Sequence, residues 1–276
     1  MSHPIRKSNI TTPSGTIAIT QQGEDNRPVV VLSHSILASS MMWTSQLSLL
    51  ANKGWRAIAM DARGHGQSSA PPPPYNLDEL GLDVIAVLDA LKIDKAHFVG
   101  LSLGGMIGFG LGIHHASRLF SLCICDARAD APTPFFNQWN ERMEIAKQKG
   151  CEALAIPTTE RWFGKAFIEA NPAIASAFQE AISQTKLDGY IGCAQAIQQM
   201  TYLERLQQIK TRTTLIVGSN DAPLPDAMED IQSRIAHSTL DLIPNAGHLP
   251  NIDQTELFNA ALLRHLNQGR ELHSRV

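Results

Sequence analysis

A serine lies between two glycines in the segment Gly100-Leu101-Ser102-Leu103-Gly104. The apolar run His97 to Leu101 before it is typical of a β-strand, and the segment Met106 to Ile113 after it is typical of a helix. A serine at such a strand-to-helix turn is held in a strained conformation, and larger flanking residues would collide with neighbouring backbone. The pattern predicts a nucleophilic serine. The competing interpretation is that Ser102 only caps the helix at 103–115.

A serine hydroxyl is a poor nucleophile at neutral pH, so it needs a base and an acid that orients the base. Asp221 follows the apolar run Thr214 to Val217, and His248 follows the run Leu240 to Ile243. Both residues therefore lie in loops at the carboxyl ends of predicted strands, in the chain order serine, acid, histidine that this kind of turn predicts. We expect Ser102 to be the nucleophile, Asp221 the orienting acid and His248 the base.

Other residues compete for these roles. Asp221 could be an ordinary turn residue after Asn220, and His248 is one of ten histidines and could be an ordinary loop residue. Asp226 is a rival acid in the same region. Asp126, at the end of the apolar run Leu119 to Ile124, is a second rival, because an acid there could also reach the histidine.

Acyl transfer also requires backbone N–H groups that point at the developing oxyanion. We expect one to be the N–H of Leu103, directly after the nucleophile, and the other to be the N–H of Ile36, in the loop after the run Val29 to Leu32. Side chains at these positions supply no donor, so substitutions there should act through backbone geometry.

The elements that must position these residues alternate between strand and helix. Between the strands at 56–60 and 97–101, Leu77 to Leu91 keeps its apolar residues at helical spacing. Such alternation predicts an α/β fold with a mostly parallel central sheet and helices on both faces. The predicted strands are Val29 to Leu32, Arg56 to Met60, His97 to Leu101, Leu119 to Ile124, Thr214 to Val217 and Leu240 to Ile243.

The alternation stops between residues 128 and 207, where helical stretches such as Trp139 to Lys149 and Asp188 to Met200 predominate. We interpret 128–207 as a helical cap inserted into a core domain made of 1–127 and 208–276. The cap would lie over the carboxyl edge of the sheet, where such sheets bind ligands, and would shape specificity. Asp61 to Ser68 is rich in turn formers and is interpreted as a structural loop that supports the fold.

Composition narrows the function classes. The net charge is −3 and the 23 lysines and arginines form no dense basic run, which argues against nucleic acid as a partner. No segment approaches the roughly 20 consecutive apolar residues of a membrane span, so we expect a cytoplasmic protein. The four cysteines show no zinc-ligand spacing and are expected to be buried, reduced thiols. No metal or other cofactor is predicted.

These residues resemble the α/β-hydrolase superfamily, and the nearest likeness is to the 3-oxoadipate enol-lactonases of bacterial aromatic catabolism. The resemblance spans nearly the whole chain, whereas the triad is specific only for the superfamily. It implies an α/β-hydrolase fold with a helical cap inserted after the sixth strand of the sheet. The stretches that carry it are Ser35 to Trp43, Asp61 to Ser68, Gly100 to His114, Trp139 to Arg142, Arg161 to Phe163, Gly189 to Ala196, Gly218 to Asp221 and Ala246 to His248.

The resemblance implies an enol-lactone substrate with a free carboxylate and 3-oxoadipate as product. A guanidinium in the cap could grip that carboxylate, and the candidates are Arg142, Arg161 and Arg128; each could instead form an ordinary surface ion pair. Trp139 and Trp162 are candidate pocket residues, although the interpretation as cap core is the simpler one for both.

Two positions depart from the family pattern. The oxyanion loop of these lactonases tends to read Asn-Ser-Leu-Gly, where this chain has His34-Ser35-Ile36-Leu37, so a glycine is missing at 37. Asp126 is acidic where a neutral residue is expected. Both departures bear on the shape and charge of the pocket.

Several functions fit the same residues. A small ester or lactone hydrolase that works through an acyl-enzyme is the leading hypothesis, as a monomer or homodimer. A general carboxylesterase, a carbon–carbon bond hydrolase and a cofactor-free haloperoxidase could use a similar triad. A ligand sensor that keeps the hydrolase fold and signals through a partner protein is the alternative of another class. Turnover separates it from the enzymes, because a sensor would hydrolyse slowly or once.

Overall fold

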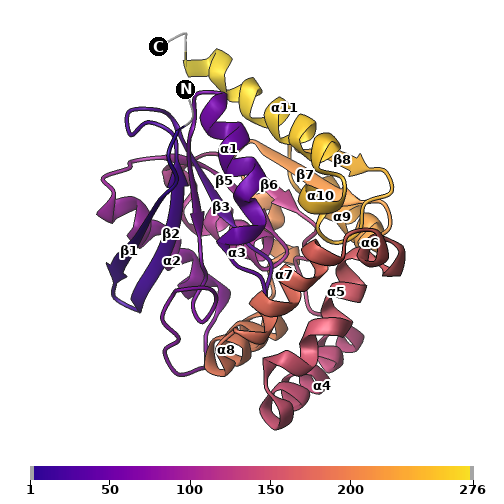
Figure 1. Cartoon of the computed structure of the whole chain (residues 1–276). Helices are drawn as coiled ribbons and strands as arrows, with labels where there is room; N and C mark the ends of the chain where they lie inside the picture. Colours follow the sequence, from indigo (N-terminus) through magenta and orange to yellow (C-terminus); the bar gives the residue numbers. More distant parts are fainter. Residues whose placement is uncertain (1–2, 274–276) are drawn as a thin grey trace.

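The computed structural model describes residues 3–273 and contains one eight-stranded sheet in the order β1-β2-β4-β3-β5-β6-β7-β8 (Figure 1). The first two strands and β4 pair antiparallel, and the remaining neighbours pair parallel. The predicted α/β class with a mostly parallel sheet is confirmed. The strands are β1 (Arg6–Thr12), β2 (Gly15–Gln22), β3 (Val29–Ser33), β4 (Arg56–Met60), β5 (Ala96–Leu101), β6 (Leu119–Cys125), β7 (Thr213–Gly218) and β8 (Thr239–Ile243).

The six predicted strands are present, whereas the N-terminal hairpin β1–β2 was missed. The hairpin escapes a search for apolar runs because β1 is an edge strand whose side chains are mostly exposed. The central strands are easier to find. All five residues of β3 are buried, and a strand covered on both faces reads as a continuous apolar run.

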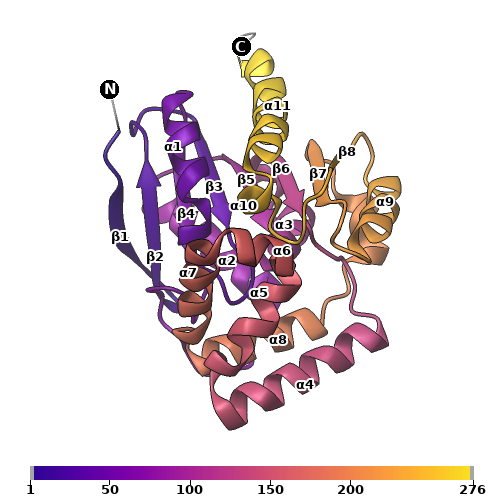
Figure 2. The same cartoon turned by 45° about the vertical axis from the view of Figure 1, so that its right-hand side comes forward.

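Helices cover both faces of this sheet. Figure 2 shows α1 (Thr44–Asn52) and α11 (Thr255–His273) in front of the strands, with α2 (Leu77–Ala90) and α3 (Leu103–His114) behind them. A further helix, α9 (Leu224–Arg234), packs on β7 and β8. This arrangement leaves the carboxyl ends of the parallel strands, with the loops that follow them, free to form a site.

Five helices separate β6 from β7 and lie together at one end of the molecule (Figure 1). The chain enters and leaves this insertion side by side, because Asp130 and Thr201 form an antiparallel bridge and Ala129 O accepts hydrogen bonds from the N–H groups of Tyr202 and Leu203. The insertion follows the sixth strand, as expected. Its helices are α4 (Thr133–Lys149), α5 (Ala155–Phe163), α6 (Lys165–Ala170), α7 (Pro172–Ser183) and α8 (Leu187–Gln198).

All four cysteines are free and buried, as predicted. Cys123 and Cys125 alternate in β6, and their Sγ atoms lie 3.9 Å apart on the same face of the strand. Within residues 3–273, no helix is both long enough and apolar enough to cross a membrane.

Candidate active site

Ser102 occupies the turn between β5 and α3 with φ 55° and ψ −111°, a conformation that an L-residue adopts only under strain. The two flanking glycines are required by their surroundings. A Cβ at Gly100 would lie 2.1 Å from Gly104 O, and a Cβ at Gly104 would lie 2.3 Å from Ser33 O. The expected collision is therefore confirmed, and this turn can form only with glycine at both positions.

The structure does not support helix capping as the role of Ser102. Its side chain makes no capping hydrogen bond to α3 and donates to no other described residue. It is 6% exposed and lines the same cavity as His248. A hydroxyl that is held in a strained turn, faces a cavity and has no structural partner is suited to attack a ligand.

His248 lies in the loop after β8 and contacts the acid in the loop after β7. Its Nδ1 donates to Asp221 Oδ2 at 2.6 Å, and both side chains are buried. The cap helps to hold this loop, because the backbone N–H of His248 donates to Trp162 O at 2.9 Å. The hydrogen bond to Asp221 fixes the ring so that Nε2 is free to accept a proton.

Neither rival acid forms a hydrogen bond with His248 among the described residues. Asp226 is an exposed residue in the first turn of α9. Asp126 follows β6, and its Oδ1 accepts the backbone N–H of Gly218 at 2.8 Å. The side chains of Asp126, Asp221 and His248 approach within 4.8 Å of one another. Because Nδ1 of His248 already donates to Asp221, this is the geometry of a hydrogen-bonded acid–base group, and it leaves no place for a metal ion between those two atoms.

The two expected oxyanion donors flank the serine. Ile36 lines the cavity with Ser102, and neither its N–H nor that of Leu103 donates to another described residue. Leu37 carries φ 66° and donates its N–H to His65 Nε2 at 2.9 Å, so it is the amide of Ile36 that is left for a ligand. The loop thus adopts at Leu37 the left-handed backbone for which the family pattern has glycine.

Two buried histidines hold this oxyanion loop, and sequence analysis missed both. His34 Nε2 accepts the N–H of Ala62 at 2.8 Å, as His65 Nε2 accepts that of Leu37. Each Nδ1 lies within 3 Å of a carbonyl oxygen, 2.7 Å from Ser35 O and 2.9 Å from Arg63 O, so each ring carries its proton on Nδ1. Burial lowers the pKa of both rings, that of His65 to about 3, and keeps them neutral.

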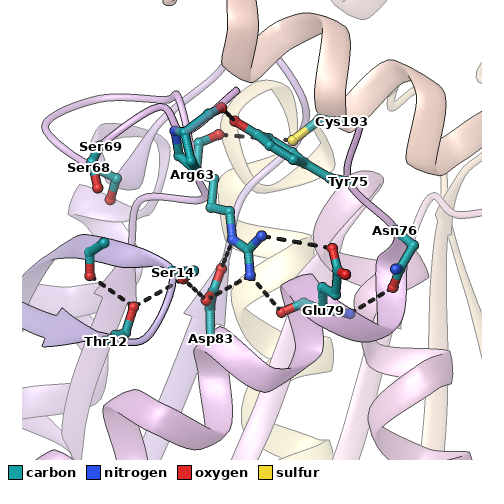
Figure 3. A network of polar contacts seen from close by, with 12 residues as sticks. Thr12, Ser14, Arg63, Ser68, Ser69, Tyr75, Asn76, Glu79, Asp83 and Cys193 are labelled. Carbon is teal, nitrogen blue, oxygen red and sulfur yellow. Dashed lines mark hydrogen bonds and ion pairs between the residues drawn. The ribbon is translucent and has the colours of Figure 1, made fainter. Parts of the chain in front are cut away.

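Arg63 anchors the loop that carries His65 (Figure 3). Its Nε donates to Asp83 Oδ2 at 2.5 Å, and Asp83 also accepts from Ser14 in the N-terminal hairpin. A second arginine nitrogen donates to Glu79 O at 3.1 Å. The interpretation of Asp61 to Ser68 as a structural loop agrees with these contacts. The structure adds that this loop supports the oxyanion loop through His65.

A cavity of about 650 Å³ lies between the core and the insertion. The core contributes the catalytic candidates and the insertion contributes most of the remaining wall, including every residue that sequence analysis proposed for substrate binding. The walls include Ile36, Ser102, Met106, Asp126, Arg128, Phe135, Trp139, Arg142, Thr158, Arg161, Trp162, Leu224 and His248.

The three candidate arginines differ in their partners. Arg128 pairs with Asp130 at 3.0 Å, and Arg161 pairs with Asp221 Oδ1 at 3.2 Å. Arg142 donates to Thr158 Oγ1 at 2.7 Å and forms no ion pair with a described residue, and its Nε is buried without a partner. Arg142 is therefore the candidate with a cationic group left to meet an anion in the cavity.

The two tryptophans serve both the wall and the packing of the insertion. Trp139 lies under Arg142, whose Cζ is 5.6 Å from its ring centre. Trp162 is 3% exposed and packs edge-on against Phe178 at 5.9 Å between centroids. Each tryptophan is buried in the insertion, and each also lines the cavity. The two interpretations, pocket wall and cap core, are therefore compatible.

Comparison with known proteins identifies the family. A family model described as the alpha/beta hydrolase fold matches residues 28–255, and the chain belongs to this family. It is 31% identical over 258 residues to 3-oxoadipate enol-lactonase 2 of Acinetobacter baylyi, with 93% of this chain and 95% of the relative covered. It is 34% identical over 252 residues to 3-oxoadipate enol-lactonase 1 of the same organism, with 90% and 92% covered.

Among solved structures, the enol-lactonase from Burkholderia xenovorans LB400 superimposes with a TM-score of 0.90 at 30% identity. The match covers 94% of this chain and 100% of the Burkholderia enol-lactonase chain. The predicted enzyme class, a carboxylic ester hydrolase similar to the 3-oxoadipate enol-lactonases, is thereby confirmed.

Proposed function

We propose that this chain is a serine hydrolase that opens the ring of 3-oxoadipate enol-lactone and releases 3-oxoadipate, as part of the catabolism of aromatic compounds. The observation that carries the proposal is the placement of Ser102, strained and without a structural partner, in the same cavity as His248, whose Nδ1 donates to Asp221. The names of the relatives supply the substrate.

The proposed reaction runs through an acyl-enzyme. His248 Nε2 takes the proton of Ser102 as Oγ attacks the lactone carbonyl, and Asp221 stabilises the imidazolium that forms. The N–H groups of Ile36 and Leu103 bind the oxyanion. Collapse of the tetrahedral intermediate breaks the ring C–O bond, and His248 returns the proton to the oxygen of the leaving enol. The enol then tautomerises to the ketone.

Water completes the cycle. His248 deprotonates it, the hydroxide attacks the acyl carbonyl, and Ser102 leaves with the proton of His248. No cofactor takes part in these steps. The cytoplasmic location and the choice between monomer and homodimer stay predictions.

Arg142 is proposed to bind the free carboxylate of the substrate. A guanidinium that faces a cavity without an ionic partner gains two charge-assisted hydrogen bonds from a carboxylate. Arg161 is less suited to this role than the sequence suggested, because its guanidinium already forms an ion pair with Asp221. Its proposed part is to hold Asp221 in place beside His248.

The test is hydrolysis of 3-oxoadipate enol-lactone beside a neutral p-nitrophenyl ester, by the wild type and by Ser102→Ala. We expect multiple turnover of the lactone, with kcat reduced by roughly 10⁴-fold or more in the variant. Turnover of the ester alone would still support catalysis by Ser102, and it would indicate a general carboxylesterase in place of a lactonase. An unchanged rate in Ser102→Ala would refute the proposed mechanism.

A further inference from the structure

Asp126 is a buried acid beside the candidate triad that the proposed mechanism does not use. It follows β6 with φ 44° and is fully buried. Its Oδ1 accepts the N–H of Gly218, whereas its Oδ2 is buried and makes no hydrogen bond with a described residue. An atom with almost no accessible surface cannot reach a substrate, so any effect of Oδ2 must pass through its neighbours.

Those neighbours include groups of both charges. A carboxyl oxygen of Asp126 lies within 4.8 Å of atoms of Asp221 and His248. The charge of Asp253 in α10 (Pro250–Asp253) raises the pKa of Asp126, the charge of Arg161 lowers it, and the thiol of Cys125 precedes Asp126 in β6. Burial raises the pKa of Asp126 well above its ordinary value, and the charge of Asp221 raises it further.

The two carboxyl groups therefore compete for one negative charge. Two carboxylates close together in a buried site do not both ionise readily, because neither water nor a cation offsets their repulsion fully. The carboxylate of Asp221 has two partners, the Nδ1–H of His248 and the guanidinium of Arg161. Asp126 has one backbone N–H and keeps the proton.

We propose that Asp126 is a positioning residue for His248: it holds the proton of a two-carboxyl pair with Asp221, and it ionises beside His248 when Asp221 carries no charge. The proposal rests on the proposed function of the triad. Neutralising Asp221 removes the repulsion but not the effect of burial, so the pKa of Asp126 falls only in part and Asp126 releases its proton to solvent as pH rises. Its charge then lies within 4.8 Å of the histidine and stabilises the imidazolium in place of Asp221.

The experiment compares wild type, Asp126→Asn, Asp221→Asn and the double variant, with kcat measured from pH 5 to pH 10. Asn at 126 is neutral like the protonated acid and can still accept from Gly218 N, so we expect a loss of about threefold. Asp221→Asn should lose roughly 10²–10³-fold, and the double variant at least about tenfold more than that. All four proteins should gain activity with pH as His248 loses its own proton. Asp221→Asn should show a second rise as Asp126 ionises, and this second rise should be missing in the double variant.

Two results would overturn the proposal. One is a double variant with the rate and pH profile of Asp221→Asn, and the other is Asp126→Asn losing as much activity as Asp221→Asn. A second measurement does not depend on activity. Infrared spectra of the wild type at pH 7 should contain the carbonyl band of a protonated carboxylic acid that disappears in Asp126→Asn, and its absence would also refute the proposal. Failure of the triad itself shows separately, as activity that survives Ser102→Ala.

Discussion

At the scale of single residues, the site depends on which polar atoms are already satisfied. Arg161 and Arg128 have carboxylate partners within the chain, and Arg142 has the hydroxyl of Thr158 and the face of Trp139. A charged group left without an ionic partner in a cavity is costly unless a ligand completes it. This difference in partners, invisible in the sequence, separates Arg142 from the other two arginines.

Replacing Arg142 by Met tests this assignment. We expect kcat/KM for the carboxylate-bearing lactone to fall roughly 10–100-fold, the equivalent of about 1.5–3 kcal/mol for a hydrogen bond to a charged group. The effect should lie mainly in KM, and the neutral p-nitrophenyl ester should lose less than about threefold. Arg264→Met is the matched control, because Arg264 pairs with Asp241 on the surface. An equal loss for both substrates would contradict carboxylate binding at this position.

At the scale of elements, two loops at the ends of neighbouring strands act as one unit. The oxyanion loop after β3 and the loop after β4 are joined by His34 and His65, each a neutral ring that accepts a backbone N–H. Protonation would turn each acceptor nitrogen into a donor and break the bond. The loops that carry the proposed oxyanion donor thus depend on two histidines that remain uncharged.

The pH dependence of stability tests the state of His65. Its pKa is about 3 in the fold against an ordinary 6.5, so the unfolded chain binds a proton between these values and the folded chain does not. Its contribution to stability is complete above pH 6.5 and is lost as pH falls toward 3. His65→Gln keeps an acceptor and does not titrate.

Urea unfolding at pH 7, 6, 5 and 4 gives the measurement. Below pH 6 the free energy of unfolding of the wild type should fall by up to about 1.4 kcal/mol per pH unit more than that of His65→Gln, the value for one proton. Other titrating groups, among them Asp126 and Asp253, are common to both proteins and cancel in the comparison. Parallel curves would show that His65 does not titrate as described.

At the scale of the whole molecule, the insertion and the core meet at very short distances. Gly64 in the loop after β4 and Gly189 in α8 face each other so closely that a Cβ on Gly189 would lie 2.1 Å from the Cα of Gly64. Lys186 N also donates to Gly64 O at 3.1 Å. Helix α8 therefore rests on the same loop that supports the proposed oxyanion donor, which ties the insertion to the core.

Gly189→Ala should push helix α8 away from the loop that carries Gly64. Overpacking of this kind costs about 1–3 kcal/mol, so we expect the melting temperature to fall by several degrees and KM to rise as the cavity changes shape. The control is Gly81→Ala in α2, where a Cβ meets Leu111 at an ordinary 3.6 Å and Ala favours the helix. A Gly189→Ala protein as stable and active as the control would mean that this contact yields easily.

Several parts of this protein could be predicted from local patterns in its sequence. Buried parallel strands must be apolar throughout, so six strands could be found, and the serine turn could be recognised because only glycine fits on either side of it. The order of Ser102, Asp221 and His248 along the chain then placed all three at one edge of the sheet. The polar edge strand β1 has no such pattern and was missed.

Which side chains meet depends on the fold of the whole chain. The sequence favoured Asp221 as the acid and left Asp126 as a rival, and hydrogen bonds to Gly218 N and His248 Nδ1 distinguish them. His34 and His65 gain their roles from loops that the sheet brings together. Partner choice depends on distances between segments far apart in the chain, and on the burial that makes each unpaired polar atom costly, and neither quantity is written in local spacing.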